Sequence, residues 1–431
     1  MSTIVVADGN WAASARDGAA TLLARCAAVA ECTDKSGEIL RTFLSPAMEQ
    51  VHQRMRPWFD AAGMTVSVDR AGNLRAVYSA DSGEPAPRLL IGSHLDTVPN
   101  AGTYDGVLGV FVGLALVEAL GGRRLPFSIE VIGFSDEEGT RFGVPFIGSR
   151  AFVNRLGDAV LGTRDTNGIT VCEALLAFRE SHPEAIDAAL AAQPSGYLEF
   201  HIEQGPVLES QNCALGTVEA LAGQSRLNLV FRGRAGHAGT TPMHLRRDAL
   251  AAAAEWMTRV ESVASGIEGL VATVGQIAAE PGGVNVIPGV VRCSLDVRHA
   301  EDEVRRDAVR SILDEAQTIA EERGLTFEAE EYHNQAAVHF DSGMISIAEI
   351  AAKRAGYAAV RMTSGAGHDA MVMAQHLPST MIFLRSPGGV SHHPDESVLE
   401  ADVAAAIHTG LCFLDEYALF VKKKKESDRR A

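Results

Sequence analysis

The chain has 431 residues, which is more than one ordinary domain holds and enough for two well-packed cores. Hydrophobic residues make up 46% and charged residues 22%, a balance typical of globular proteins and not of disordered ones. The net charge of -17, without a broad basic stripe, argues against a nucleic-acid partner.

The apolar runs and the cysteines indicate in which part of the cell the protein is expected. The longest apolar run that we recognise, residues 107–117, is shorter than a membrane span, so we expect no membrane partner. The six cysteines show neither CxxC spacing nor a disulfide framework, which favours reduced thiols. We therefore expect a cytoplasmic protein.

Four apolar runs are predicted to be buried parallel strands, and polar residues follow each of them. The runs cover residues 89–91, 129–134, 197–200 and 380–384. They lead, in chain order, to His94, to Asp136 with Glu137 and Glu138, to His201, and toward His392. Because ligands of open α/β sheets bind beyond the carboxyl ends of the strands, we expect these side chains to gather at one sheet edge.

Between residues 216 and 332 the pattern changes to strands with one solvent-exposed face. Leu227, Leu229 and Phe231 alternate with Asn228, Val230 and Arg232, and helices are predicted near residues 245–264 and 301–323. Further strands are expected near 270–276, at 293–297, where Cys293, Leu295 and Val297 also alternate, and near 325–331, which gives the β-α-β-β-α-β order of a ferredoxin-like unit. We therefore predict an α/β catalytic domain in two parts, residues 1–215 and 333–431, with 216–332 inserted between them.

The ligand types suit two divalent ions. Such a pair needs a carboxylate between the ions and one or two further His or carboxylate ligands for each. Asp105, on a Gly-flanked turn, is the expected bridge. We expect His94 and His392 to complete the first ion site, and Glu138 and His201 to complete the second.

Two further carboxylates beside these ligands have expected roles of their own. Asp96, two residues after His94, suits a carboxylate that orients this imidazole. Adjacent Glu137 and Glu138 are not expected to point at one ion together, which leaves Glu137 as a general base. A free glutamate beside the ions can take a proton from water and pass it to a leaving nitrogen, as amide hydrolysis requires.

At this point the chain resembles the M20 family of metal-dependent amidohydrolases, and most closely its branch that acts on ureido groups. The motifs that carry the resemblance lie at residues 134–142, 201–205, 235–243, 284–288 and 364–370. The resemblance implies a mixed-sheet, metallopeptidase-like catalytic domain with an inserted ferredoxin-like α+β domain that serves as lid and dimerisation domain. It also implies a homodimer.

The resemblance assigns further residues. His237 matches a residue that reaches the neighbouring subunit's site and steadies the oxygen of the tetrahedral intermediate. Asn285 and Arg298 match substrate-binding positions, and the planar Arg fork fits a substrate carboxylate. Gln204 and the turn that begins at Gly365 would line the pocket. The remaining assignments concern histidines. Alignment on the preceding segment Gly389-Val390-Ser391 selects His392 as the ligand and leaves His393 exposed, and His368 is expected in the pocket without being a ligand.

The implied reaction is two-metal hydrolysis of a ureido C–N bond, with Zn or Mn as the ions and Co or Ni as possible replacements. Gln224 and Arg226 belong to a polar segment that resembles enzymes acting on allantoate, so the expected activity is allantoate amidohydrolase, which releases ammonia and CO2. The alternatives are an N-carbamoyl-L-amino-acid hydrolase or a β-ureidopropionase, and more remotely a deacylase or peptidase of the wider family. A non-catalytic binding protein is disfavoured because the base and all five ligands are present.

Overall fold

The structure is a computed structural model that describes residues 11–83, 85–190 and 194–428. The chain divides into two compact units. Unit 1 comprises residues 1–219, 340–362 and 368–431, and unit 2 comprises residues 220–339 and 363–367. Each unit is described by itself below.

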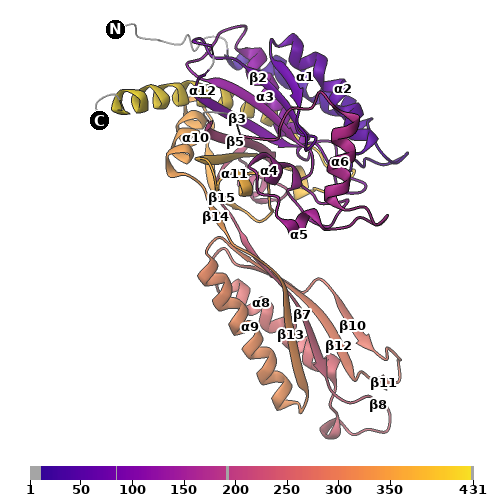
Figure 1. Cartoon of the computed structure of the whole chain (residues 1–431). Helices are drawn as coiled ribbons and strands as arrows, with labels where there is room; N and C mark the ends of the chain where they lie inside the picture. The colour runs from indigo at the N-terminus through magenta and orange to yellow at the C-terminus, as the bar shows by residue number, and fades with distance from the viewer. Residues whose placement is uncertain (1–10, 84, 191–193, 429–431) are drawn as a thin grey trace. The chain divides into compact units, whose positions relative to one another are not determined.

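Unit 1 is a layered α/β structure built on a mixed sheet (Figure 1). The nine-stranded sheet has the order β1-β2-β4-β3-β5-β16-β6-β14, with β15 paired to β6. Its strands are β1 (Thr65–Val68), β2 (Leu74–Tyr78), β3 (Arg88–His94), β4 (Ser128–Phe134), β5 (Pro194–Ile202), β6 (Leu215–Leu221), β14 (Val338–His339), β15 (Ala359–Ser364) and β16 (Ser379–Leu384). Of these, β14 and the last two residues of β6, with which it pairs, fall in unit 2, as do the last two residues of β15. The neighbours β4, β3, β5 and β16 are parallel to one another, so their carboxyl ends meet at one edge.

Helices cover this sheet. They are α1 (Trp11–Ala30), α2 (Pro46–Ala61), α3 (Val107–Ala119), α4 (Ile147–Phe152), α5 (Asp158–Leu161), α6 (Val171–Ser181), α7 (Val207–Ser210), α10 (Ser342–Arg354), α11 (Ala370–Met373) and α12 (Glu400–Asp428), with a 3-10 turn η2 (Pro387–Gly389). The mixed α/β architecture confirms the predicted fold class.

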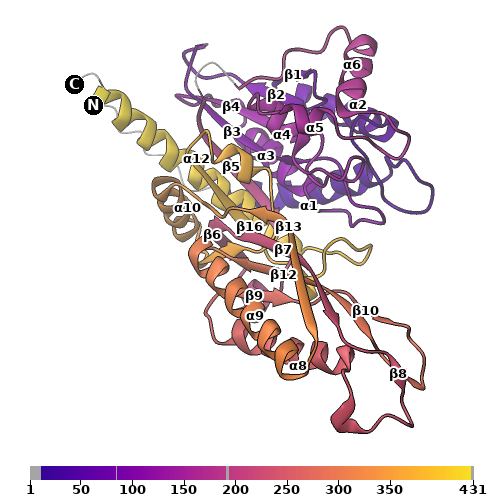
Figure 2. The ribbon, with the colours of Figure 1, turned by 60° about the horizontal axis from the view of Figure 1, so that its bottom comes forward.

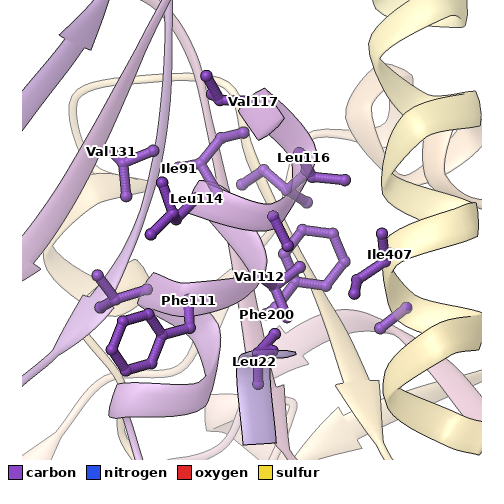
Figure 3. Close-up of a cluster of buried hydrophobic side chains, with 14 of the residues drawn as sticks. Leu22, Ile91, Phe111, Val112, Leu114, Leu116, Val117, Val131, Phe200 and Ile407 are labelled. Atoms are coloured by element: carbon purple, nitrogen blue, oxygen red, sulfur yellow. The ribbon is translucent and has the colours of Figure 1, made fainter. Parts of the chain in front are cut away.

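Helix α3 lies at the centre of the largest hydrophobic core. In Figure 3 its side chains fill the space between Ile91 and Val131 of the sheet and Ile407 of α12. Gly109 allows the close approach, because a Cβ there would overlap the carbonyl oxygen of Phe200 in β5. The helix that follows Asp105 is thus fixed against the strands that carry the other polar residues.

Unit 2 has the ferredoxin-like order that the sequence predicts. Its five-stranded antiparallel sheet has the order β10-β12-β7-β13, with β9 paired to β12, and α8 and α9 cover one face (Figure 2). The elements are β7 (Gly223–Arg232), α8 (Ala249–Ser265), β9 (Val271–Thr273), β10 (Ile277–Glu280), β12 (Val290–His299), α9 (Asp302–Glu322) and β13 (Thr326–Gln335). A short pair, β8 (Gly236–His237) with β11 (Val286–Ile287), and a 3-10 turn η1 (Met243–Leu245) complete it.

Burial in β7 follows the predicted alternation. Leu227, Leu229 and Phe231 are buried against the helices, whereas Asn228 between them is exposed. Such alternation is the pattern of a sheet with one wet face. The inserted segment predicted at residues 216–332 overlaps unit 2, but residues 216–219 stay with unit 1, and unit 2 extends to residue 339 and includes residues 363–367.

Helix α12 was not recognised from the sequence as a candidate membrane span. Residues Glu400–Lys423 are long and apolar enough by length and composition, with mean hydropathy 1.3. However, 72% of the 18-residue apolar stretch within this helix is buried inside the structure, and residues such as Val403, Ile407 and Leu411 belong to the main core. We therefore interpret α12 as a core helix, whose apolar composition reflects burial in protein.

Candidate metal centre

The expected ligands come together within unit 1 at the carboxyl ends of its parallel strands. His94 is the last residue of β3, and His201 is the penultimate residue of β5. We predicted both residues to lie beyond the ends of the strands, but both lie inside them. Glu138 follows β4 by four residues, and His392 lies in the loop after β16. The strands continue because the backbones of both histidine segments still pair with their neighbours.

Asp105 is the centre of the group. Its Oδ1 lies 3.5 Å from Nε2 of His94 and 3.1 Å from Nε2 of His201. Its Oδ2 lies 3.2 Å from Nε2 of His392, which is itself 3.4 Å from Oε1 of Glu138. One carboxylate therefore has two ligand pairs, one at each oxygen, which is the arrangement of a bridging ligand.

The turn that presents Asp105 depends on glycine. Gly106 has a φ of 70°, and a Cβ there would lie 2.5 Å from ring atoms of His94. Both the left-handed backbone and the close imidazole exclude other residues. The short motif Asp105-Gly106 therefore places a carboxylate next to a histidine ring before α3 begins.

The hydrogen bonds of the imidazoles fit a bound cation. Nδ1 of His94 lies 3.0 Å from the carbonyl oxygen of Asp96, and Nδ1 of His201 lies 2.9 Å from that of Ile202. Each Nδ1 must carry the proton that a carbonyl accepts, so in a neutral ring Nε2 presents a lone pair. These lone pairs face Asp105, whose buried Oδ1 has no hydrogen-bond donor of its own. Acceptors that converge in this way are satisfied by a positive ion, so the residues present fit a metal.

The electrostatics point the same way. Burial alone would lower the pKa of His94, but the neighbouring carboxylates of Asp105 and Asp96 raise it well above its usual value. The hydrogen bond to Asp105 raises the pKa of His392 to about 9. Burial would raise the pKa of Asp105, yet the three histidines hold it well below its usual range. A pocket whose charges favour protonated imidazoles also favours a divalent cation in place of those protons.

The division of ligands between two ions differs from our expectation. The sequence led us to pair His94 with His392 and Glu138 with His201. In the structure, His94 and His201 group with Asp105, and Glu138 and His392 form the other group with Asp105. The reason is the sheet order: β3 and β5 are adjacent parallel strands, so the histidines at their ends face the same oxygen.

Asp96 supports the site in a manner that differs in part from the prediction. Its carboxylate Oδ1 lies 3.5 Å from Nδ1 of His94, farther than its own carbonyl oxygen. Its two carboxylate oxygens accept the backbone N–H groups of Glu137 and Glu138, at 2.9 and 3.1 Å. Asp96 therefore fixes the backbone of the predicted base as well as the ring of a predicted ligand.

Glu137 is buried beside the ligands. Burial raises its pKa well above the usual value, and the charge of Glu138 adds to this while His94 opposes it. A raised pKa makes the ionised carboxylate a better proton acceptor. We expected that Glu137 and Glu138 would not point at one ion together. In the structure, however, the potential ligand atoms of His94, Glu137 and Glu138 lie within 4.8 Å of one another.

Three other polar residues lie around the centre. Nε2 of Gln204 donates to Oδ2 of Asp105 at 2.9 Å and lies 3.4 Å from Nε2 of His392, so this predicted substrate residue contacts the ligands. His368 is buried with its ring centroid 4.4 Å from that of His201, and burial lowers its pKa well below the usual value. His393 is exposed, as expected.

The predicted residues of unit 2 have different surroundings. His237 is exposed on β8, where its Nδ1 accepts the N–H of Gly239, and Asn285 is exposed. Arg298 donates to Asp296 through Nε and Nη2 and to the carbonyl oxygen of exposed Gly365 through Nη1.

On β7, neighbouring predicted residues belong to the same cluster. Gln224 is buried opposite Arg298 in the β7–β12 register. Arg226 is opposite Asp296 in that register and donates to it at 2.9 Å. Polar residues assigned to substrate thus gather on two paired strands.

One residue beneath the centre was missed from the sequence. Glu199 is completely buried and accepts hydrogen bonds from Ser93, Tyr197 and the backbone N–H of Ala370, at 2.9 to 3.0 Å. It therefore ties β3 and β5 to α11. A glutamate within the apolar run 197–200 is the signal that could have identified it, because a buried carboxylate needs partners.

Comparison with known proteins gives the family. Residues 90–416 match the model of Peptidase family M20/M25/M40, and the chain belongs to this family. An allantoate deiminase of Glycine max is 37% identical over 91% of this chain and 88% of its own length. An N-carbamoyl-L-amino acid amidohydrolase of Geobacillus stearothermophilus is 38% identical over 86% of this chain and 91% of its own. A solved amidase of the hydantoinase/carbamoylase family from Burkholderia multivorans aligns with a TM-score of 0.86 at 31% identity, covering 92% of this chain and 97% of that one.

Proposed function

We propose that the protein is a metal-dependent amidohydrolase that cleaves the C–N bond of a ureido group. The observation that carries this proposal is the grouping of three histidines and Glu138 around the two oxygens of Asp105. The named relatives, an allantoate deiminase and an N-carbamoyl-L-amino acid amidohydrolase, support a ureido group as the substrate's reacting part.

The residues of the chain have distinct parts in this reaction. His94, Asp105, His201, Glu138 and His392 would hold two divalent ions, which would supply Lewis acidity to polarise a carbonyl oxygen and make water more acidic. Glu137 removes a proton from the attacking water and returns it to the leaving nitrogen. Water adds to the ureido carbonyl carbon, the C–N bond breaks, and the carbamate that is released decomposes to ammonia and CO2.

Allantoate is the substrate that we favour. It carries two ureido arms and one carboxylate, so a site for it needs more polar donors than a site for a carbamoyl derivative with an apolar side chain. Gln224, Arg226 and Arg298 on the paired strands β7 and β12 supply such donors. His237 is proposed to stabilise the oxyanion, and Asn285 and Gly365 to line the substrate site.

The alternative substrate class is an N-carbamoyl-L-amino acid or N-carbamoyl-β-alanine. The 38% identity to an N-carbamoyl-L-amino acid amidohydrolase favours it as much as the 37% identity to an allantoate deiminase favours allantoate. A panel assay decides: with Mn added, ammonia release is measured from allantoate, N-carbamoyl-L-amino acids and N-carbamoyl-β-alanine, and release of the free amino acid is measured from an N-acyl amino acid. We expect the highest kcat/KM for allantoate. Turnover of the N-acyl amino acid alone would overturn the ureido assignment.

Three further properties belong to the same proposal. We propose Zn or Mn as the ions, with Co or Ni as substitutes, because mixed His and carboxylate sites accept all four. A homodimer formed through unit 2 would bring His237 of one subunit to the site of the other. The six free cysteines are compatible with a reducing cytoplasm, where we place the protein.

A further inference from the structure

Glu396 is a buried carboxylate to which the reaction assigns no role. Only 5% of its surface is exposed. Its Oε1 accepts the backbone N–H groups of two consecutive residues, Tyr104 at 2.8 Å and Asp105 at 3.0 Å. The residue that these bonds hold, Asp105, is the proposed bridge between the ions.

The other oxygen of Glu396 faces the loop that carries His392. Oγ of Ser391 lies 3.3 Å from Oε2 of Glu396 and 2.9 Å from Oδ2 of Asp105. The hydroxyl therefore lies between the two carboxylates, next in sequence to His392. The backbone N–H of Glu396 closes a turn onto the carbonyl oxygen of His393, which shapes the same loop.

The surroundings leave room for this carboxylate and little else. Gly102 lies in the loop before Asp105, and a Cβ at this position would overlap the Glu396 side chain. Two segments almost 300 residues apart in sequence are thus joined through one side chain. Hydrogen bonds from two N–H groups to a carboxylate are charge-assisted and directional, so they restrict the orientation of the Asp105 backbone.

We infer that Glu396 is a positioning residue that joins the Asp105 turn to the His392 loop and so sets the geometry of the bridging carboxylate. The hydrogen bonds of its carboxylate are to two backbone N–H groups and the Ser391 hydroxyl, and not to the side chain of a proposed ligand. Glu396 acts by holding Asp105 so that each of its oxygens faces its own pair of ligands. This inference rests on the proposed metal centre.

Metal affinity tests the inference without substrate. Purified apoprotein is titrated with Co2+ by calorimetry, and the visible absorption of bound Co2+ reports the coordination. Glu396→Ala removes both acceptors and should weaken binding about 10- to 100-fold, the usual effect of losing a residue that orients a ligand. Glu396→Gln keeps an oxygen for the two N–H groups and an amide donor for Ser391, so its Kd and Co2+ spectrum should stay near those of the parent.

Asp69→Ala is the matched control. Asp69 is likewise buried and accepts the backbone N–H groups of Ala71 and Asn73, but it contacts no proposed ligand. It should lower the thermal midpoint as Glu396→Ala does and leave the Co2+ affinity unchanged. Equal weakening by both variants would mean that Glu396 acts only on general stability.

A double-mutant cycle gives a second test that does not depend on the alanine variant folding well. Gly102→Ala displaces the carboxylate of Glu396 and should weaken Co2+ binding. In a Glu396→Ala background the same change should have little further effect, because the clash is gone. Additive losses would overturn the inference. If Asp105→Ala itself leaves metal affinity intact, the proposed metal centre fails, whereas normal affinity in Glu396→Ala alone rejects only this positioning role.

Discussion

The two units differ in how their functional residues are held. In unit 1 the proposed ligands His94, Asp105 and His201 are buried, and each has a further contact from its own unit that orients it. In unit 2, His237 and Asn285 are exposed, and Arg298 is already paired with Asp296. The contrast teaches that unit 1 holds its proposed metal ligands in a preorganised arrangement, whereas His237 and Asn285 of unit 2 have exposed side chains that are accessible to a substrate or a second subunit.

The largest expected effect tests the metal centre of unit 1. Asp105→Ala should reduce turnover to background and lower the metal content, because both ion sites lose a ligand. Glu137→Gln should also abolish turnover, but with metal retained, since only the base is lost. Metal analysis by mass spectrometry separates the two outcomes, and normal metal occupancy in Asp105→Ala would contradict the bridging assignment.

The next prediction tests whether unit 2 acts on a partner. His237→Ala should lower kcat about 100- to 1,000-fold if the imidazole stabilises an oxyanion. Mixed dimers of Glu137→Gln and His237→Ala chains should regain part of the activity, because one of the two sites then receives a complete set of residues. Recovery no greater than the sum of the two homodimers would place His237 in its own subunit or outside catalysis.

Substrate selection by unit 2 should give a smaller change. Arg298→Lys keeps the charge but loses the planar fork, so KM should rise about tenfold for every carboxylate substrate. Gln224→Leu with Arg226→Leu should lower kcat/KM for allantoate and leave a carbamoyl amino acid nearly unaffected. Asp296→Asn is the control, because both arginines pair with this residue. If it reproduces the losses on all substrates, the arginines act through the pairing and not through substrate.

The smallest expected effect concerns the pH dependence of the stability of unit 1, which is measured without reference to its activity. Burial, with Arg56 and His182 nearby, lowers the pKa of His52 from 6.5 to about 4. Between these two pKa values the unfolded chain binds a proton at His52 and the folded chain does not. The free energy of unfolding therefore falls as the pH drops below 6.5, and it stops falling below about pH 4. Between pH 7 and pH 5 this amounts to about 2 kcal/mol. His52→Gln should remove that part of the pH dependence in urea unfolding. Parallel pH profiles for the two proteins would show that His52 is not held neutral.

The sequence predicts four strands of unit 1 and the main strands and helices of unit 2, for identifiable reasons. Continuous apolar runs mark the buried parallel strands, and the alternation of Leu227, Leu229 and Phe231 marks a half-exposed one. The ferredoxin-like order of unit 2 follows from these patterns. The limits of β3 and β5 were less predictable, because polar His94 and His201 continue the strand pairing that the apolar residues begin.

The grouping of ligands and their supporting contacts required the structure. Local spacing does not state that β3 lies beside β5, and this adjacency makes His94 and His201 share one oxygen of Asp105. Glu396 and Glu199 were missed for a related reason. Glu199 interrupts an apolar run, but Ser93 and Ala370, which it joins, are remote in sequence, as are Tyr104 and Asp105 from Glu396, so no local motif reports these contacts. Long-range contacts of this type emerge only from the tertiary fold.

The position of β16 between β5 and β6 has a consequence for biosynthesis. During translation, β5 and β6 leave the ribosome well before β16, and the place between them in the sheet cannot be filled until residues 379–384 emerge. Helix α12, which completes the main core, follows later still. Domains generally fold as units as they are synthesised, yet this sheet must wait for nearly the whole chain. Until β16 emerges, the facing edges of β5 and β6 therefore lack the strand that pairs with both, and a chain truncated before residue 379 would lack a central strand.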